Sequence, residues 1–199
     1  MSSFIGHSLA ALMTYSVEKQ PTSLKKIYWL EWLIVIASAP DIDHIFQSLR
    51  PTVNYQTIRI THSFALSLLL PLGTILVLAL LGCKGHSLIT RTQQVILAGL
   101  SHLAFDLLTG VNSLPLLWPL STATFKLSFG LLPSAGSFNL SNYYFYRNSL
   151  IEMGVLVPLV FIAFLMNYDK TINSYSKLRI GGLLLISLCF MIWAFSLNR

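Results

Sequence analysis

Hydrophobic residues in this chain gather in long runs that are separated by shorter polar stretches. The runs at residues 64–81, 154–166 and 181–197 are each long enough, or nearly long enough, to cross a bilayer core of about 30 Å. We predict helices over the following stretches: residues 4–17, 24–39, 61–82, 90–109, 149–167 and 177–197. The expected fold class is all-α, a polytopic membrane bundle of about six helices whose first two members are short.

Proline, glycine and capping residues set several of the predicted helix ends. Pro40 ends the second helix because it lacks an N–H group and disfavours helix at the residue before it. Thr90 is a candidate N-cap of the fourth helix, and Gly110 is a candidate C-cap. The longest connection, residues 111–148, lies between the fourth and fifth helices. Apolar and polar residues alternate over 125–129, which indicates a short strand or an interfacial hairpin and so a partly extended connection.

Composition supports a membrane protein and excludes several classes. Of 199 residues, 54% are hydrophobic and 10% are charged, which rules out a typical soluble enzyme. Thirteen Lys and Arg against 7 Asp and Glu give a net charge of +6, but the basic residues are scattered, so we expect no nucleic-acid partner. Cys83 and Cys189 are not expected to pair. No signal peptide is evident before His7, so we expect the amino terminus to belong to the mature protein.

Three acids and four histidines fall into four short clusters. The clusters are Gly6-His7-Ser8, Pro40-Asp41-Ile42-Asp43-His44, Thr61-His62-Ser63 and the segment from His102 to Asp106. Ionisable groups in apolar helices are costly and usually find partners in a polar interior. If the six helices alternate in direction, all four clusters lie on the same side of the membrane. His86 lies in the opposite connection and is left out of the site.

These clusters predict a metal site. Its candidate ligands are His7, Asp41, Asp43, His44, His62, His102 and Asp106. Carboxylates and imidazoles without a thiolate suit a divalent transition metal, zinc first and manganese or iron as alternatives, better than Mg or Ca. Seven candidates exceed the needs of one tetrahedral ion, so the site has room for one or two ions.

Each cluster also has a structural interpretation. His102 and Asp106 are one helical turn apart and could form a hydrogen bond that joins two helices. An Asp after Pro40 could cap a turn, and His62 could cap a helix. We assign catalytic roles to Asp43 and to Arg59, which could hold a phosphate oxygen; an anchor in the lipid headgroups is an equally good interpretation of Arg59.

The motifs resemble those of a known family. The order G-H-S, P-D-I-D-H, T-H-S and S-H-L-x-x-D-x-L-T, followed by residues 114–119 (Leu-Pro-Leu-Leu-Trp-Pro), is similar to the YdjM-like family of inner-membrane, metal-dependent hydrolases. The resemblance covers residues 4–120 and implies that the same seven side chains bind metal. Members of that family often carry H-R-G where this chain has Thr57-Ile58-Arg59, and the carboxyl-terminal third matches only in being hydrophobic.

A more distant similarity concerns the chemistry. The order of an amino-terminal His, a Pro-Asp, a His and H-x-x-x-D resembles the zinc-dependent phospholipase C and P1-type nuclease group, which implies a phosphoester as substrate. We therefore expect one integral membrane domain over residues 1–199: a metal-site core at 4–120, an interfacial connection at 121–148 and two transmembrane helices at 149–199.

The expected function is hydrolysis of a phosphoester in a lipid or lipid-linked substrate by a metal-activated water, at the cell inner membrane. The alternative is a divalent-metal transporter or sensor that uses the same ligands. A transporter should have polar residues along a path to both faces, whereas these ligands gather towards one face. Eight of the 13 basic residues lie in the connections opposite the site, so the positive-inside rule predicts a site that faces away from the cytoplasm.

Overall fold

The computed structural model describes residues 4–16, 25–42, 59–110, 113–127, 130–133, 141–168 and 174–197. Within these ranges the chain forms six α-helices: α1 (Phe4–Tyr15), α2 (Lys25–Ser38), α4 (Phe64–Leu80), α5 (Gly85–Thr109), α6 (Tyr143–Tyr168) and α7 (Ser174–Ser196). Two short 3-10 helices, η1 (Ala39–Asp41) and η2 (Ile60–His62), follow α2 and precede α4. The all-α class is therefore confirmed for the described part of the chain.

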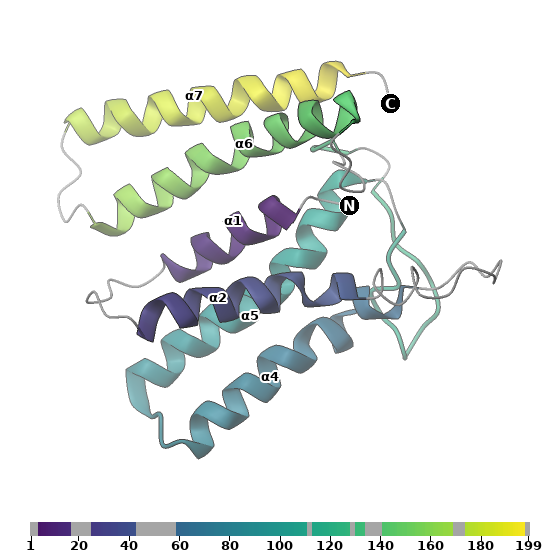
Figure 1. Ribbon diagram of the computed structural model, residues 1–199, viewed down its shortest axis with the longest axis vertical. Helices are drawn as coiled ribbons and strands as arrows, with labels where there is room; N and C mark the ends of the chain where they lie inside the picture. Colours follow the sequence, from purple (N-terminus) through teal and green to yellow (C-terminus); the bar gives the residue numbers. More distant parts are fainter. Residues whose placement is uncertain are drawn as a thin grey trace.

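The long helix α5 holds the amino-terminal helices together (Figure 1). It packs against α1, α2 and α4, while α1 also packs against α6, and α6 packs against α7. The core between α1, α2 and α5 is built from Ala11, Leu33, Ile36, Ala37, Val95 and Ala98. Three of these are alanines, whose small side chains allow the helix axes to approach closely.

A buried glutamine on α5 joins three helices. The side chain of Gln94 accepts a hydrogen bond from Nε1 of Trp29 on α2 (2.8 Å) and donates one to the backbone oxygen of Tyr15 at the end of α1 (3.3 Å). Because Gln94 is fully buried, these bonds supply the partners that a polar group needs in an apolar environment. They hold the ends of α1 and α2 that lie away from the residues of the metal-site clusters.

The predicted helix limits are close at α1, α2 and α7 and wrong at two helix starts. Helix α5 begins at Gly85 and not near Thr90, which lies buried inside the helix with its hydroxyl 3.3 Å from Nδ1 of His86. Helix α6 begins six residues before position 149, because the side chain of Asn142 accepts a hydrogen bond from the backbone of Tyr144 and caps the first turn. Gly110 does end α5, in the left-handed conformation with φ of 61°.

The expected strand at 125–129 is reduced, among the described residues, to one antiparallel bridge. Leu114 and Phe125 exchange two backbone hydrogen bonds of 2.8 Å. Two residues further on, the backbone oxygen of Leu116 accepts a hydrogen bond from the first residue of α4, Phe64 (3.0 Å). The Leu-Pro-Leu-Leu-Trp-Pro segment therefore supports the start of α4, next to His62.

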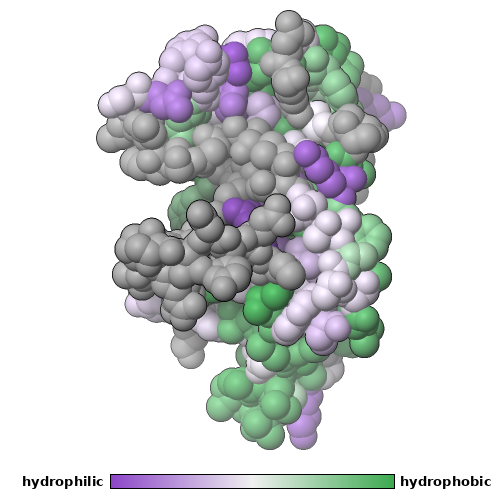
Figure 2. Space-filling model, turned by 90° about the vertical axis from the view of Figure 1, so that its right-hand side faces the viewer, coloured by the Kyte–Doolittle hydropathy of each residue, from purple (hydrophilic) through white to green (hydrophobic). Residues whose placement is uncertain are grey.

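Among the residues that the structure describes, two helices are long and apolar enough to cross a membrane, Tyr143–Asn167 and Tyr175–Ser196. A shorter apolar helix, Phe64–Leu80, exposes Leu69, Leu72, Leu76 and Leu80. Figure 2 looks onto the right-hand side of Figure 1 and shows apolar side chains over much of the surface that is coloured there. The structure thus supports a membrane protein with two candidate spans, and the number of further spans stays a prediction.

Candidate metal centre

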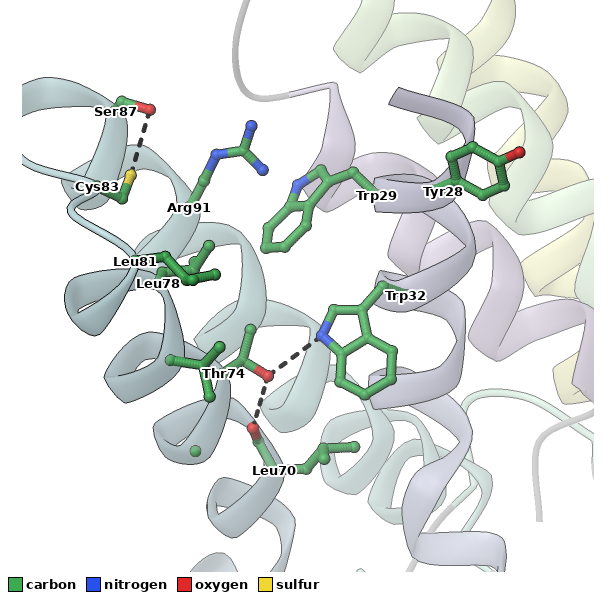
Figure 3. A pocket seen from close by; sticks show the side chains of 12 residues that line it. Tyr28, Trp29, Trp32, Leu70, Thr74, Leu78, Leu81, Cys83, Ser87 and Arg91 are labelled. Atoms are coloured by element: carbon green, nitrogen blue, oxygen red, sulfur yellow. Dashed lines mark hydrogen bonds between the residues drawn. The ribbon is translucent and has the colours of Figure 1, made fainter. Parts of the chain in front are cut away.

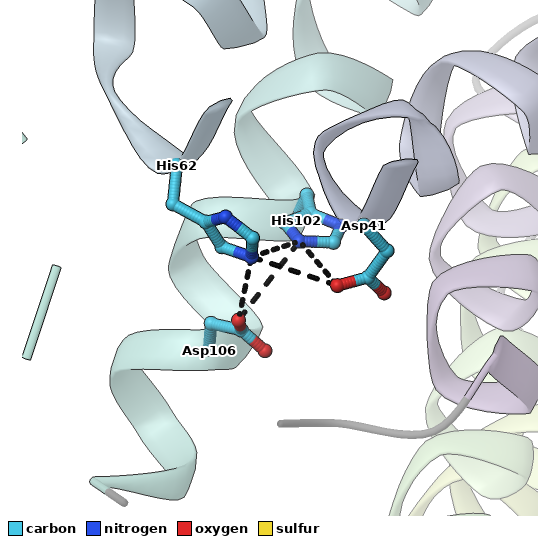
Figure 4. Close-up of side chains that lie close together, drawn as sticks. All are labelled: Asp41, His62, His102 and Asp106. Atoms are coloured by element: carbon cyan, nitrogen blue, oxygen red, sulfur yellow. Dashed lines mark hydrogen bonds and ion pairs between the residues drawn. The ribbon is translucent and has the colours of Figure 1, made fainter. Parts of the chain in front are cut away.

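Four side chains from three separate segments point toward one another at one end of the bundle (Figure 4). Asp41 comes from η1, His62 comes from η2, and His102 and Asp106 lie one turn apart on α5. Each of these residues offers one ligand atom, and the four atoms all lie within 4.8 Å of one another. The convergence expected from alternating helices is therefore present for these four members of the predicted set.

The distances within this group suit a single small cation. Nε2 of His62 lies 3.2 Å from Nε2 of His102, 3.3 Å from Oδ2 of Asp106 and 3.5 Å from Oδ1 of Asp41. Nε2 of His102 lies 3.6 Å from Oδ1 of Asp41 and 3.9 Å from Oδ2 of Asp106. A tetrahedral ion with ligand bonds of about 2.0–2.1 Å needs ligand atoms about 3.3 Å apart. The five separations above bracket that value, and the residues fit such an ion once the atoms that lie furthest apart, within 4.8 Å of each other, move inward.

The outer nitrogens of the two histidines determine which atom faces the centre. Nδ1 of His102 lies 2.8 Å from the backbone oxygen of Ala37, which can only accept, so we assign the proton to Nδ1 and the lone pair to Nε2. Nδ1 of His62 lies 3.1 Å from the hydroxyl of Thr61, whose oxygen can likewise accept a hydrogen bond from the ring. A hydrogen bond at the far ring nitrogen is the usual way in which proteins orient a metal-binding imidazole.

Burial differs among the four side chains. His62 and His102 are fully buried and Asp106 is 2% exposed, whereas the side chain of Asp41 is 27% exposed. Burial raises the pKa of Asp41, but its interaction with His62 and the charges of His102 and His7 outweigh burial, so the pKa lies below its ordinary value. Asp41 is therefore the most exposed of the four side chains, and its carboxylate stays ionised.

His7 forms a second layer against this group. Its ring stacks on that of His102, with centroids 4.0 Å apart and planes inclined by 11°. Its Nε2 lies 3.7 Å from Oδ2 of Asp41, the oxygen that does not face His62 and His102. Asp41 thus presents one oxygen to the four-residue group and the other to His7, an arrangement in which a carboxylate can bridge two ions or orient a neighbouring ligand.

Local sequence explains how His62 reaches α5. Ser63 caps α4 through a hydrogen bond from the backbone of Leu66 to its side chain (3.3 Å), so the chain turns sharply just after His62. Helix α4 then passes very close to α5 at Gly99: a Cβ there would lie 2.7 Å from Cγ of Pro71 and 2.8 Å from the backbone oxygen of Ser67. Glycine at this position, one turn before His102, permits the approach that brings the two histidines together.

The other predicted site residues have different outcomes. Asp43 and His44 lie outside the described residues. Arg59 directly precedes η2 and is half-buried, three positions before His62. His86 lies in the first turn of α5, at the end away from the centre, as expected.

Sequence reasoning missed one acid near the centre. Glu152 on α6 is 1% exposed, and its carboxyl group lies against Gly6 on α1, where a Cβ would overlap Oε1. Gly6 is the third residue of α1, in the first turn, where backbone N–H groups lack acceptors within the helix and the helix dipole favours negative charge. Glu152 is therefore placed to stabilise the turn that carries His7, and this role is a prediction. Its place in the apolar run after position 149 was the signal that could have found it.

Comparisons with known proteins give one match. The family model described as YdjM inner membrane protein matches residues 1–196. This match confirms the resemblance and extends it beyond residues 4–120, because it includes both carboxyl-terminal helices. No curated protein and no solved structure matches the chain. The similarity to zinc-dependent phospholipases and nucleases stays a prediction from the motifs.

Proposed function

The chain belongs to the YdjM inner membrane protein family, and from this premise we propose that it is a membrane-bound, metal-dependent hydrolase acting on a phosphoester of a lipid or lipid-linked molecule. The observation that carries the proposal is the convergence of Asp41, His62, His102 and Asp106 with separations close to those around a tetrahedral ion. Two imidazoles and two carboxylates are ligands typical of zinc, manganese and iron(II).

The buried and the partly exposed residues of the centre have different proposed roles. His62, His102 and Asp106 are buried, so a substrate would approach the ion from the side of the partly exposed Asp41. A divalent ion held here would lower the pKa of a water molecule and stabilise charge on a phosphoryl oxygen. His7 and the second oxygen of Asp41 are positioned to accept a proton or to orient a further ligand. Arg59, just before η2, is our candidate for holding a phosphate oxygen.

A cavity beside the centre supports a lipid substrate. A space of about 500 Å³ lies between α1, α5 and α6, with Ala10, Leu97, Leu100, Ala104 and Leu108 in its mostly apolar lining. Phe105 belongs to the same lining and meets the ring of His7 edge-on, with centroids 6.4 Å apart. A hydrocarbon chain in this cavity would place the attached phosphoester near His7 and Asp41.

The transporter alternative is less well supported. In the described ranges, the side chains that could hold a metal gather in one group at one end of the bundle. On α5, the buried polar residues between that group and the opposite end are Gln94, which bonds to Trp29 and Tyr15, and Thr90, whose hydroxyl lies 3.3 Å from Nδ1 of His86. A carrier requires a path to both faces.

The test begins with metal content. We expect purified protein to contain zinc, manganese or iron, and Asp106→Asn and His102→Gln to lose most of it. His86→Gln is the matched control, because it removes a histidine from the same helix at the far end. The metal-loaded protein should hydrolyse a long-chain phosphodiester, and a chelator should stop it. If the protein contains metal but hydrolyses no lipid phosphoester, the sensor or transporter is supported. If all variants contain the same amount of metal, these residues do not form the metal site.

A further inference from the structure

A second cavity lies away from the metal centre, in an open groove between α2 and α4 (Figure 3). Helices α2 and α4 both pack on α5, which forms the floor, and the space between them has a volume of about 1080 Å³. Its walls are apolar on the α4 side, with Leu70, Val77, Leu78 and Leu81, and aromatic on the α2 side, with Tyr28, Trp29 and Trp32.

One cation enters this groove. The guanidinium of Arg91, half-buried on α5, lies 4.6 Å above the ring of Trp29 (Figure 3). No residue of the lining carries a carboxylate, and within the described ranges no acid pairs with Arg91. Stacking on an indole orients the guanidinium plane and leaves its edge N–H groups available for a phosphate. Lys84 directly precedes α5, so a second basic residue belongs to the same end of this helix.

The groove is separate from the metal centre. Arg91 and His102 are 11 positions apart on α5, which corresponds to about 16 Å along the helix axis. Trp32 donates a hydrogen bond to the hydroxyl of Thr74 (3.2 Å), which joins α2 to α4 across the groove between these two levels. Whatever occupies the groove is thus held at the opposite end of the bundle from the hydrolase site.

We propose that this groove binds an anionic phospholipid, with its phosphate on Arg91 and one acyl chain along the leucines of α4. Such a lipid has an anionic headgroup and apolar acyl chains. The groove offers a cation and interfacial aromatic side chains for the headgroup, and a long apolar wall for an acyl chain. A free phosphate would use Arg91 but leave the apolar wall empty. The proposal does not depend on the hydrolase activity.

Native mass spectrometry of the detergent-purified full chain tests the assignment. We expect one molecule of dioleoyl phosphatidylglycerol to bind more tightly than dioleoyl phosphatidylcholine. Arg91→Gln should weaken phosphatidylglycerol about fivefold to tenfold, because one arginine–phosphate contact is lost. The matched control is Arg179→Gln: Arg179 lies over Tyr175 in the same way (4.9 Å), near the start of α7 and outside the groove, and its loss should change nothing.

A second pair of variants tests the apolar part. A Cβ added at Gly73, in the lining, meets nothing within 4 Å, so we expect Gly73→Phe to fold, to fill part of the groove and to weaken the binding of both lipids. Gly181→Phe is the control, because a Cβ there is equally free of contacts but lies on α7, outside the groove. Equal effects of the two arginine variants, or no preference for the anionic lipid, would overturn the proposal. Competition by inorganic phosphate alone would assign a soluble anion instead. A dimer that Gly73→Phe disrupts would assign the groove to a second copy of the chain.

Discussion

Gly6 and Glu152 provide the sharpest test of how the bundle holds His7. In the structure, the carboxyl group of Glu152 occupies the space that a side chain at Gly6 would need. Gly6→Ala places a methyl group on Oε1 and 2.9 Å from Cδ, so the buried carboxyl group must rotate away from the first turn of α1. The turn then loses its acidic partner, and His7 is no longer held against His102.

The magnitude follows from two opposing effects. Overpacking a buried position typically costs about 1–3 kcal/mol, and the low end applies because the displaced atoms end a flexible side chain. Alanine gains up to about 1 kcal/mol over glycine in a helix. We expect a net loss of at most about 0.5 kcal/mol in the free energy of unfolding. In a Glu152→Ala background the space is free, so Gly6→Ala should stabilise instead, by about 0.5–1 kcal/mol.

A double-mutant cycle measured by chemical unfolding in detergent gives this coupling directly. Gly181→Ala is the control, since its added methyl group meets nothing within 4 Å and should stabilise equally in both backgrounds. Metal affinity, measured in parallel, should fall in Gly6→Ala and stay unchanged in Gly181→Ala. If Gly6→Ala has the same effect with and without Glu152, the carboxyl group does not hold the turn, and the reasoning is wrong.

Three further predictions follow from the site and its surroundings. Gly99→Ala should lower the free energy of unfolding by about 2–3 kcal/mol, because its Cβ meets Pro71 and a backbone oxygen that cannot move aside; chemical unfolding checks this, and a neutral result would refute the close approach of α4 and α5. Asp41 has a lowered pKa, so its stabilising contribution is complete above its ordinary value of 3.8 and is lost as the pH falls through the lower folded-state value. In acid-unfolding curves of the metal-free protein, we therefore expect the wild type to show this loss of stability and Asp41→Asn not to show it. Identical curves for the two proteins would contradict the prediction. An impermeant maleimide on intact cells should label a cysteine at Ser137 and spare one at Ser174; the reverse pattern would place the metal centre on the cytoplasmic side.

Helix content and helix direction could be predicted from the sequence because both depend on local patterns. Apolar runs longer than a strand, separated by short polar connections, leave few alternatives to antiparallel helices. That alternation was enough to place His62, His102 and Asp106 at one end of the bundle with Asp41. It also placed His86 at the other end. Start signals were weaker: α5 begins five residues before Thr90, since several polar residues can occupy a first helical turn.

The geometry of the centre depended on contacts between residues far apart in the chain. No local pattern indicates that Nδ1 of His102 faces Ala37, 65 positions away, or that His7 stacks on His102. The apolar run that contains Glu152 could signal an unusual acid, but only the packing of α6 on α1 brings that acid to Gly6. Periodicity defines which face of a helix is apolar, whereas the rotation and separation of two helices arise from how their side chains fit, and at this site small residues such as Gly6 and Gly99 allow the close fit.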